Sequence, residues 1–191
     1  MGKYSKAKMF NKNASRKRSK ADQILKTLNI QLGQTIADIG SGGGFFTFLF
    51  SQLVGDKGRI YAIDTNKDFL EFIIKQVTEQ DLTNVTTVLA TEHAISLPSD
   101  SVDLIFVRNV YHHLQNRVQY FTKVKKLLSS QGRIAIIEYS RKGSFLSFTC
   151  KCNHNVPQKI IIEEMRTAGF QVSASFDFLP VQSFTIFDPT P

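Results

Sequence analysis

The stretch Ile36–Phe46 constrains the fold more than any other part of the sequence. An apolar run ends with an acid, a cluster of four glycines follows, and apolar residues then resume. Glycine accepts positive φ angles and lets the backbone come close to a ligand, and a helix presents unpaired N–H groups at its start. The stretch therefore predicts a strand, a tight turn and a helix beside a ligand. A dinucleotide fingerprint would need G-x-G-x-x-G, but Phe45 occupies the sixth position.

The remaining chain alternates between apolar strands and amphipathic helices. After a first helix with Ser19 as its N-cap, we expect strands over residues 34–39, 59–64, 85–90, 102–107 and 133–138, with helices over 44–54, 67–80 and 116–128. Pro157 suits the start of a last helix that ends at Gly169, with Asn155 as a possible cap. Two strands, over 170–178 and 181–187, would close the fold. The pattern predicts a doubly wound α/β fold: a mostly parallel seven-stranded sheet, helices on both faces and a C-terminal antiparallel β-hairpin.

Composition limits the class of protein. A chain of 191 residues suits one domain with a sizeable core. No apolar run approaches the roughly 18 residues of a membrane span, and the N-terminus has no apolar segment typical of a secretory signal. Cys150 and Cys152 are too close together in sequence for a disulfide between them to stabilise the fold. We therefore expect a reducing, cytoplasmic setting and no membrane span.

The net charge of +8 is concentrated in residues 1–20, which hold eight basic side chains and no acidic one. The rest of the chain has 16 basic and 16 acidic residues. We therefore expect a basic flexible arm over residues 1–18, followed by a single domain over residues 19–191. The arm could bind an anionic surface such as RNA or lipid headgroups. Alternatively, it is a solvated leader that folds over the ligand site or has no role.

Polar residues stand where the predicted strands end, and in an open parallel sheet ligands bind beyond these carboxyl ends. We expect a single site built from Asp38, Asp64, Glu92, His93, Arg108 and Asn109, with Tyr111, His112 and His113 directly after them. Asp64 lies 24 residues after Gly40, at the end of the second strand. A carboxylate there can accept two charge-assisted hydrogen bonds from a ribose diol.

The ordered set of motifs resembles the class I S-adenosylmethionine-dependent methyltransferases. The matching segments are Asp38–Gly44, Asp64, Leu97-Pro98 with Ser101–Ile105, Asn109–Leu114, and Leu127-Leu128 with Gly132-Arg133. The resemblance extends over about residues 20–188 and is greatest to small, single-domain members of the family. It implies S-adenosyl-L-methionine as the cofactor.

The resemblance also implies roles for individual residues. Gly40 and Gly42 would let the backbone pass under the methionine part of the cofactor, Asp38 would hold its amino group, and Asp64 would bind the ribose hydroxyls. Glu92 is the best candidate for the adenine contact, with His93 next. The expected cofactor residues are Asp38, Gly40, Ser41, Gly42, Gly44, Asp64, Thr65, Glu92, His93 and Asn109.

Methyl transfer is a displacement at an activated carbon. The protein therefore mainly positions the two reactants and provides a favourable electrostatic environment. A protonated acceptor would need a general base, and His112 or His113 is placed to serve as one. The alternative is that these histidines cap the next helix, pack against the cofactor or contact the substrate.

The residues after the fourth strand limit the chemical class of the methyl acceptor. The chain has no Asn/Asp-Pro-Pro-aromatic segment, which is typical of base-amino methyltransferases, and no Pro-Cys nucleophile. A small-molecule acceptor is favoured. Two alternatives remain: an RNA or protein methyltransferase docked through residues 1–20, and a cofactor-binding protein without catalysis. A nicotinamide-dependent oxidoreductase would require G-x-G-x-x-G and a substrate domain, which the sequence lacks.

The segment Cys150-x-Cys152-x-His154 offers ligands that suit zinc, but no fourth ligand is evident nearby. We therefore expect no metal site and treat both cysteines as ordinary thiols. Phe145 and Phe148 in the same loop are expected to line an apolar substrate pocket or its lid.

Overall fold

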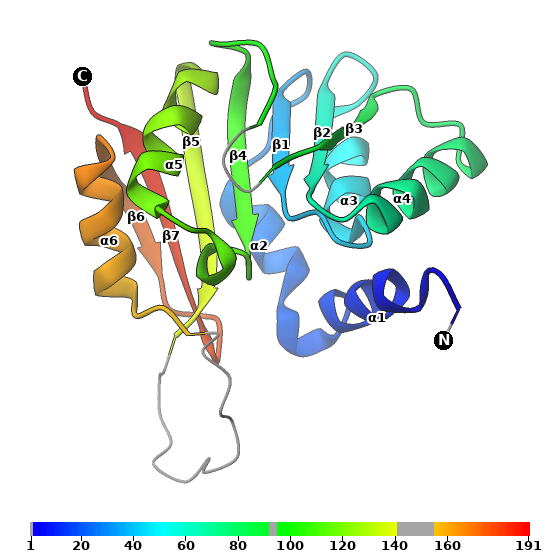
Figure 1. The fold of residues 1–191 in the computed structure, drawn as a ribbon, viewed down its shortest axis with the longest axis horizontal. Helices are drawn as coiled ribbons and strands as arrows, with labels where there is room; N and C mark the ends of the chain where they lie inside the picture. The colour runs from blue at the N-terminus through cyan, green and yellow to red at the C-terminus, as the bar shows by residue number, and fades with distance from the viewer. Residues whose placement is uncertain (1, 92–94, 141–154) are drawn as a thin grey trace, which may run out of the picture.

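The strands of the computed structural model form one sheet, and Figure 1 shows its arrangement. The structure describes residues 2–91, 95–140 and 155–191. The sheet has the order β3-β2-β1-β4-β5-β7-β6. Its strands are β1 (Thr35–Ile39), β2 (Arg59–Asp64), β3 (Val85–Leu89), β4 (Val102–Arg108), β5 (Leu128–Tyr139), β6 (Phe170–Phe176) and β7 (Gln182–Pro189). Strands β1 to β5 run parallel to one another, whereas β7 pairs antiparallel with both β5 and β6. The predicted seven-stranded sheet and its C-terminal hairpin are confirmed.

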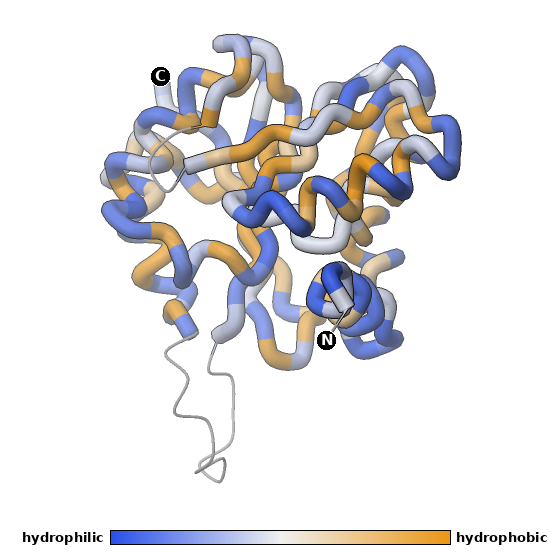
Figure 2. Tube along the Cα trace, turned by 45° about the vertical axis from the view of Figure 1, so that its right-hand side comes forward, coloured by the Kyte–Doolittle hydropathy of each residue, from blue (hydrophilic) through white to orange (hydrophobic). Residues whose placement is uncertain are grey.

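Helices cover both faces of this sheet. They are α1 (Ser5–Ala14), α2 (Ala21–Leu28), α3 (Phe45–Val54), α4 (Lys67–Glu79), α5 (Arg117–Val124) and α6 (Gln158–Thr167), with 3-10 turns η1 (Lys17–Ser19), η2 (Tyr111–His113) and η3 (Lys125–Leu127). Buried side chains of α2 and α3 belong to one apolar core, and those of α5 and α6 belong to the other. Figure 2 shows hydrophilic and hydrophobic residues alternating along the helices.

The central strands read as continuous apolar runs because both of their faces are buried. Successive side chains of a strand point to opposite faces. In β1, Ile36 joins the core under α2 and α3, whereas Ala37 joins the core under α5 and α6. The same alternation places Asp38 on the α3 side, where it contacts Thr47. None of the described helices is long and apolar enough to cross a membrane.

Three predicted boundaries are wrong, each for a local reason. The Ser19 hydroxyl donates to the backbone oxygen of Asn13 instead of capping a helix, and α2 begins after Lys20 in a left-handed conformation. Asn155 is not the cap of α6, because Pro157 precedes its first residue and no side chain caps it. Strand β5 begins at Leu128, earlier than expected, because Leu128 pairs with Val102.

The N-terminal segment, expected as a flexible arm, forms helix α1 in the structure. Ala7 is buried, Tyr4 packs on Phe72, and Phe10 meets Phe69 edge to face with 5.5 Å between ring centroids. The expectation rested on charge alone. The structure differs because apolar side chains at helical spacing anchor the segment against α4.

Candidate functional site

The glycine turn between β1 and α3 requires glycine for reasons that the structure shows. Gly40, Gly42 and Gly44 have φ angles of +74°, +55° and +81°, which L side chains rarely adopt. A Cβ atom on Gly40 would lie 2.1 Å from Cγ2 of Val110, which follows β4. The turn therefore packs directly against the chain beyond β4. Its geometry brings together the ends of β1 and β4, where the sequence predicted a ligand.

Helix α1 covers part of the glycine turn. The Asn11 amide Nδ2 donates to the Gly43 oxygen at 2.7 Å, and a Cβ on Gly43 would lie 2.3 Å from the Ala7 oxygen. The Phe10 ring would lie 3.6 Å from a Cβ on Gly42. Folding of residues 1–18 over the ligand site was one of the alternatives from the sequence, but the individual contacts were not predicted. The spacing of Tyr4, Ala7 and Asn11 along one helical face was the signal that could have revealed them.

Asp38 is buried at the end of β1, with its side chain on the α3 face. The Thr47 hydroxyl donates to Asp38 Oδ2 at 2.6 Å. Burial raises the pKa of Asp38 to about 7, and the nearby Asp64 also raises it, while the Thr47 hydrogen bond and the charge of Arg108 oppose the rise. Asp38 therefore changes its charge near neutral pH, so a cationic group placed beside it would favour its ionised form.

Asp64 joins the end of β2 to the glycine turn. The Gly42 N–H donates to its Oδ2 and the Asn66 N–H donates to its Oδ1, both at 2.9 Å. Burial raises the pKa of Asp64, and these backbone hydrogen bonds oppose that shift. Each carboxylate oxygen has a second lone pair, so Asp64 can still accept hydroxyl protons from a ligand. Thr65, also predicted for the site, is exposed beside it.

Asn109 follows β4 in a left-handed conformation with φ +57°. Its N–H donates to the Ile137 oxygen at 2.8 Å, and its Oδ1 accepts from Nε2 of Gln182 at 2.5 Å. The structure therefore places Asn109 at the predicted edge of the sheet, but it directs the side-chain oxygen to β7. Asn109 ties together the ends of β4, β5 and β7.

Buried polar atoms at this edge that have no hydrogen-bond partner among the described residues include Ser41 Oγ and Arg108 Nε. The Arg108 guanidinium lies 5.1 Å from the ring centroid of Phe46. Burial lowers the pKa of Arg108, while the charges of Tyr139 and Asp38 raise it. A buried polar atom without a partner is unfavourable by about 1–3 kcal/mol. Such atoms fit a polar ligand that would supply the partner.

Glu138 is a site residue that sequence reasoning missed. It ends the apolar run of β5, and its side chain is fully buried. Its Oε2 accepts from the His112 N–H at 3.2 Å and lies 3.0 Å from His112 Nδ1. The signal was present, because Glu138 is the residue before the last in β5, as Asp38 is in β1. His112 is nearly buried, whereas His113 is exposed and its ring centroid lies 4.0 Å from that of His112.

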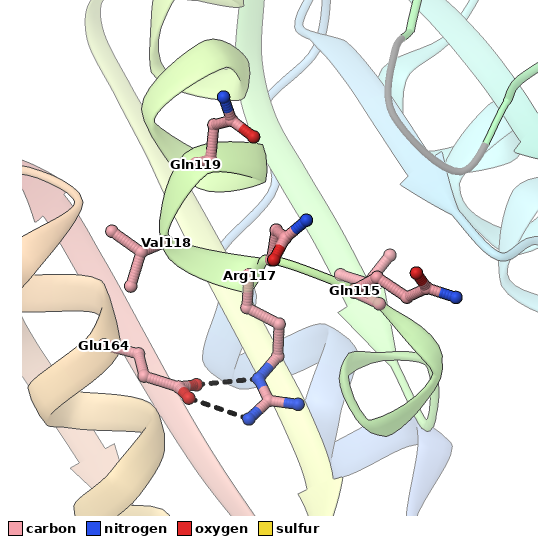
Figure 3. A pocket seen from close by; sticks show the side chains of 7 residues that line it. Gln115, Arg117, Val118, Gln119 and Glu164 are labelled. Atoms are coloured by element: carbon pink, nitrogen blue, oxygen red, sulfur yellow. Dashed lines mark hydrogen bonds and ion pairs between the residues drawn. The ribbon is translucent and has the colours of Figure 1, made fainter.

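A polar cluster on the outer side of η2 holds that turn in place. The Tyr111 hydroxyl donates to Glu164 Oε2 at 2.6 Å. Arg117 donates to both oxygens of Glu164, at 2.8 and 2.7 Å, as Figure 3 shows. These side chains border an open depression lined by residues 114–119 and Glu164. No predicted cofactor residue lines it, so its features do not define the cofactor site.

The structure brings together Asp38, Gly40, Ser41, Gly42, Gly44 and Asp64 at the carboxyl edge of the sheet. Glu92 and His93 lie outside the described residues, as do Phe145, Phe148, Cys150, Cys152 and His154. Over the described ranges, no group of three or more His, Cys, Asp or Glu side chains could hold a metal ion.

A family model described as a methyltransferase domain matches residues 30–177. A ubiquinone/menaquinone biosynthesis C-methyltransferase, UbiE, from Marinomonas sp. (strain MWYL1) is 27% identical over 118 residues, which are 61% of this chain and 47% of the relative. The chain thus spans about half the length of the curated relatives it matches.

Solved structures share the fold. A SAM-dependent methyltransferase from Aquifex aeolicus aligns with a TM-score of 0.79 at 23% identity over 87% of each chain. A Burkholderia thailandensis 1,6-didemethyltoxoflavin-N1-methyltransferase with bound 1,6-didemethyltoxoflavin and S-adenosylhomocysteine aligns with a TM-score of 0.71 at 17% identity, over 91% of this chain and 78% of that one. Because the family model matches most of the chain and the fold agrees, this chain belongs to the class I S-adenosylmethionine-dependent methyltransferase family.

Proposed function

We propose that this chain binds S-adenosylmethionine at the carboxyl edge of its sheet and transfers the methyl group to a small-molecule acceptor. The observation that carries the proposal is the convergence of Asp38, the glycine turn and Asp64, together with Ser41 Oγ and Arg108 Nε, which are buried without a partner among the described residues. When bound, the cofactor supplies an electrophilic methyl group on a positively charged sulfur.

In this proposal, each residue contacts a different part of the cofactor. Asp64 accepts the ribose hydroxyls, and Asp38 in its ionised form attracts the amino group of the methionine part. Ser41 and Arg108 offer donors to its polar groups, while Gly40, Gly42 and Gly44 shape the backbone beneath it. Thr65 lies beside Asp64, and Asn109 positions the chain that borders the acceptor.

A small-molecule acceptor is supported by the names of similar proteins, which concern ubiquinone, menaquinone and 1,6-didemethyltoxoflavin. A second candidate is an RNA or protein acceptor docked through residues 1–20. It is supported by the exposure of all eight basic side chains in that segment. A cytoplasmic setting remains a prediction from the sequence.

Calorimetry with S-adenosylhomocysteine tests the cofactor site, and failure of the wild-type protein to bind it would refute the proposal. Methyl-labelled S-adenosylmethionine then tests the reaction. Hydroquinone, the simplest reduced quinone ring, is the first acceptor probe, followed by small amines and thioethers. Labelling of RNA or protein alone, lost when the exposed basic side chains of residues 1–20 are replaced by glutamine, would favour the second candidate. Cofactor binding with no labelled acceptor of any class would indicate a binding protein without catalysis.

A further inference from the structure

The N-terminal segment carries the whole net charge of the chain, and most of its cations have no counter-ion. All eight basic side chains of residues 1–20 are exposed. Lys3 forms an ion pair with Glu71, and Lys20 Nζ lies 5.8 Å from the ring centroid of Phe178. The other six make no ion pair within the part of the chain that the structure describes. This basic surface consists of Lys6, Lys8, Lys12, Arg16, Lys17 and Arg18.

Two large apolar residues are exposed among these cations. Met9 is 46% exposed and Phe10 is 44% exposed. Residues three or four apart are neighbours on the surface of a helix. Lys6 therefore borders both Met9 and Phe10, and Lys12 borders Met9 on the other side. The basic surface thus combines positive charge with apolar side chains that are accessible to a partner.

The packing of α1 determines which of its faces points outward. Ala7 is buried, and the side chain of Asn11 donates to the glycine turn. Met9 is two residues from each of them, which places it about 200° around the helix axis, on the opposite face. The Ser19 hydroxyl donates to the Asn13 oxygen at 2.9 Å. This hydrogen bond holds the basic turn η1 beside α1, so both elements present their cations from a fixed position.

The residue types of this surface favour anionic lipid headgroups over RNA. Helices that lie on a membrane place apolar side chains among lysines and arginines, and anionic lipids attract such cations. A protein that binds single-stranded RNA adds exposed aromatic rings on which bases stack. Here the rings of Tyr4 and Phe10 already pack on Phe72 and Phe69. Met9 offers no ring for a base, and six of the eight basic residues are lysines, whereas arginine is preferred for nucleic acids.

The location of α1 relates this surface to the sheet. Figure 1 shows α1 beyond the ends toward which the arrows of β1 and β4 point, which is the carboxyl edge. The hydrogen bond from Asn11 to Gly43 confirms that α1 lies against the glycine turn. A membrane bound through the outer face of α1 would therefore lie on the side of the molecule that holds the glycine turn and Asp64.

We propose that α1 and η1 dock the chain on the surface of a membrane that contains anionic lipids. The cations of the basic surface meet the negatively charged headgroups. Met9 and the exposed part of Phe10 enter the boundary between headgroups and acyl chains. This proposal concerns binding alone and needs neither cofactor nor acceptor, so its test is independent of the methyl transfer proposed above.

The first test is flotation of the full chain with lipid vesicles. The wild type should float with vesicles of phosphatidylserine and phosphatidylcholine, but not with phosphatidylcholine alone, and added salt should release it. The triple variant Lys6→Gln, Lys8→Gln and Lys12→Gln should bind the anionic vesicles about tenfold or more weakly. A wild type that binds neither kind of vesicle, or a triple variant that binds like the wild type, would overturn the proposal.

A matched control removes the same charge elsewhere. Lys57→Gln, Lys123→Gln and Lys159→Gln replace three exposed lysines outside the N-terminal segment. This variant should float like the wild type, and a loss equal to that of the N-terminal triple variant would show that only net charge matters and refute a defined docking surface. Glutamine is a good helix former, and circular dichroism checks that both triple variants remain folded.

The second test places a reporter at the docking surface. The chain has no tryptophan, so Met9→Trp introduces a single indole whose emission should shift to shorter wavelength on anionic vesicles. Leu32→Trp is the control, because Leu32 is 81% exposed and precedes β1, at the opposite edge of the sheet. No shift in Met9→Trp, or an equal shift in Leu32→Trp, would contradict the proposal. Binding of the wild type to single-stranded RNA without binding to anionic vesicles would also overturn it, in favour of a nucleic-acid partner.

Discussion

Asp38 should make cofactor binding depend on pH in a range where few carboxyl groups titrate. Its pKa is raised to about 7 by burial. The amino group of the methionine part is a cation at neutral pH and would be attracted only to the ionised carboxylate. Lowering the pH should therefore weaken binding by protonating Asp38 in the free protein.

The size of the effect follows from the ionised fraction. With a pKa of about 7, about nine tenths of Asp38 is ionised at about pH 8 and about one tenth at about pH 6. Apparent affinity scales with the competent fraction. We therefore expect the dissociation constant for S-adenosylhomocysteine to rise about tenfold between these conditions, which corresponds to about 1.4 kcal/mol.

Isothermal titration calorimetry over this pH range is the assay, and Asp38→Asn is the matched control. The asparagine oxygen can still accept the Thr47 hydroxyl, but it carries no charge at any pH. Its affinity should be low and independent of pH. A wild-type affinity that stays constant across the range, or an equal slope in Asp38→Asn, would refute the role of Asp38.

Three further predictions concern neighbouring residues. The unfolding free energy of the free protein should fall as pH rises from about 4 to about 7, because the raised pKa makes folded Asp38 hold its proton longer than the unfolded chain does. Urea titrations should show this slope, and Asp38→Asn should reduce it to the part that the raised pKa of Asp64 contributes. Asp64→Ala should weaken S-adenosylhomocysteine binding by about 1.5–3 kcal/mol for each lost hydrogen bond, and calorimetry showing unchanged affinity would remove Asp64 from the ribose role. Gly43→Ala should displace α1, because its Cβ would meet the Ala7 oxygen at 2.3 Å; faster hydrogen exchange in residues 5–14 with a stable core would show this, and unchanged exchange would contradict it.

The sequence predicted the central fold well because the relevant signals are local. Strands β1 and β2 are apolar runs with an acid at or next to the last residue, and their observed bounds, Thr35–Ile39 and Arg59–Asp64, agree closely with those expected. The glycine turn could be predicted from its residue types alone. Asp38 and Asp64 reach one edge because parallel strands end together, which is a property of the fold class.

Features that depend on distant partners were not predictable in this way. Glu138 belongs to the site because it accepts a hydrogen bond from His112, which is 26 residues away in sequence. The two residues are brought together by the pairing of β4 with β5. The N-terminal segment was interpreted from its charge, but Asn11 and Gly43, 32 residues apart, hold it to the glycine turn. The Asn109 side chain is directed by Gln182, 73 residues later.

The position of β7 also has a consequence for synthesis on the ribosome. This strand is made after β6, yet it lies between β5 and β6 in the sheet. The half of the sheet that holds Asp38 and Asp64 can assemble early, since β1, β2 and β4 precede it. Glu138 stays at an open edge until Ser183 emerges and pairs with it. During translation, the predicted cofactor half can therefore form before the edge at Glu138 is closed by β7.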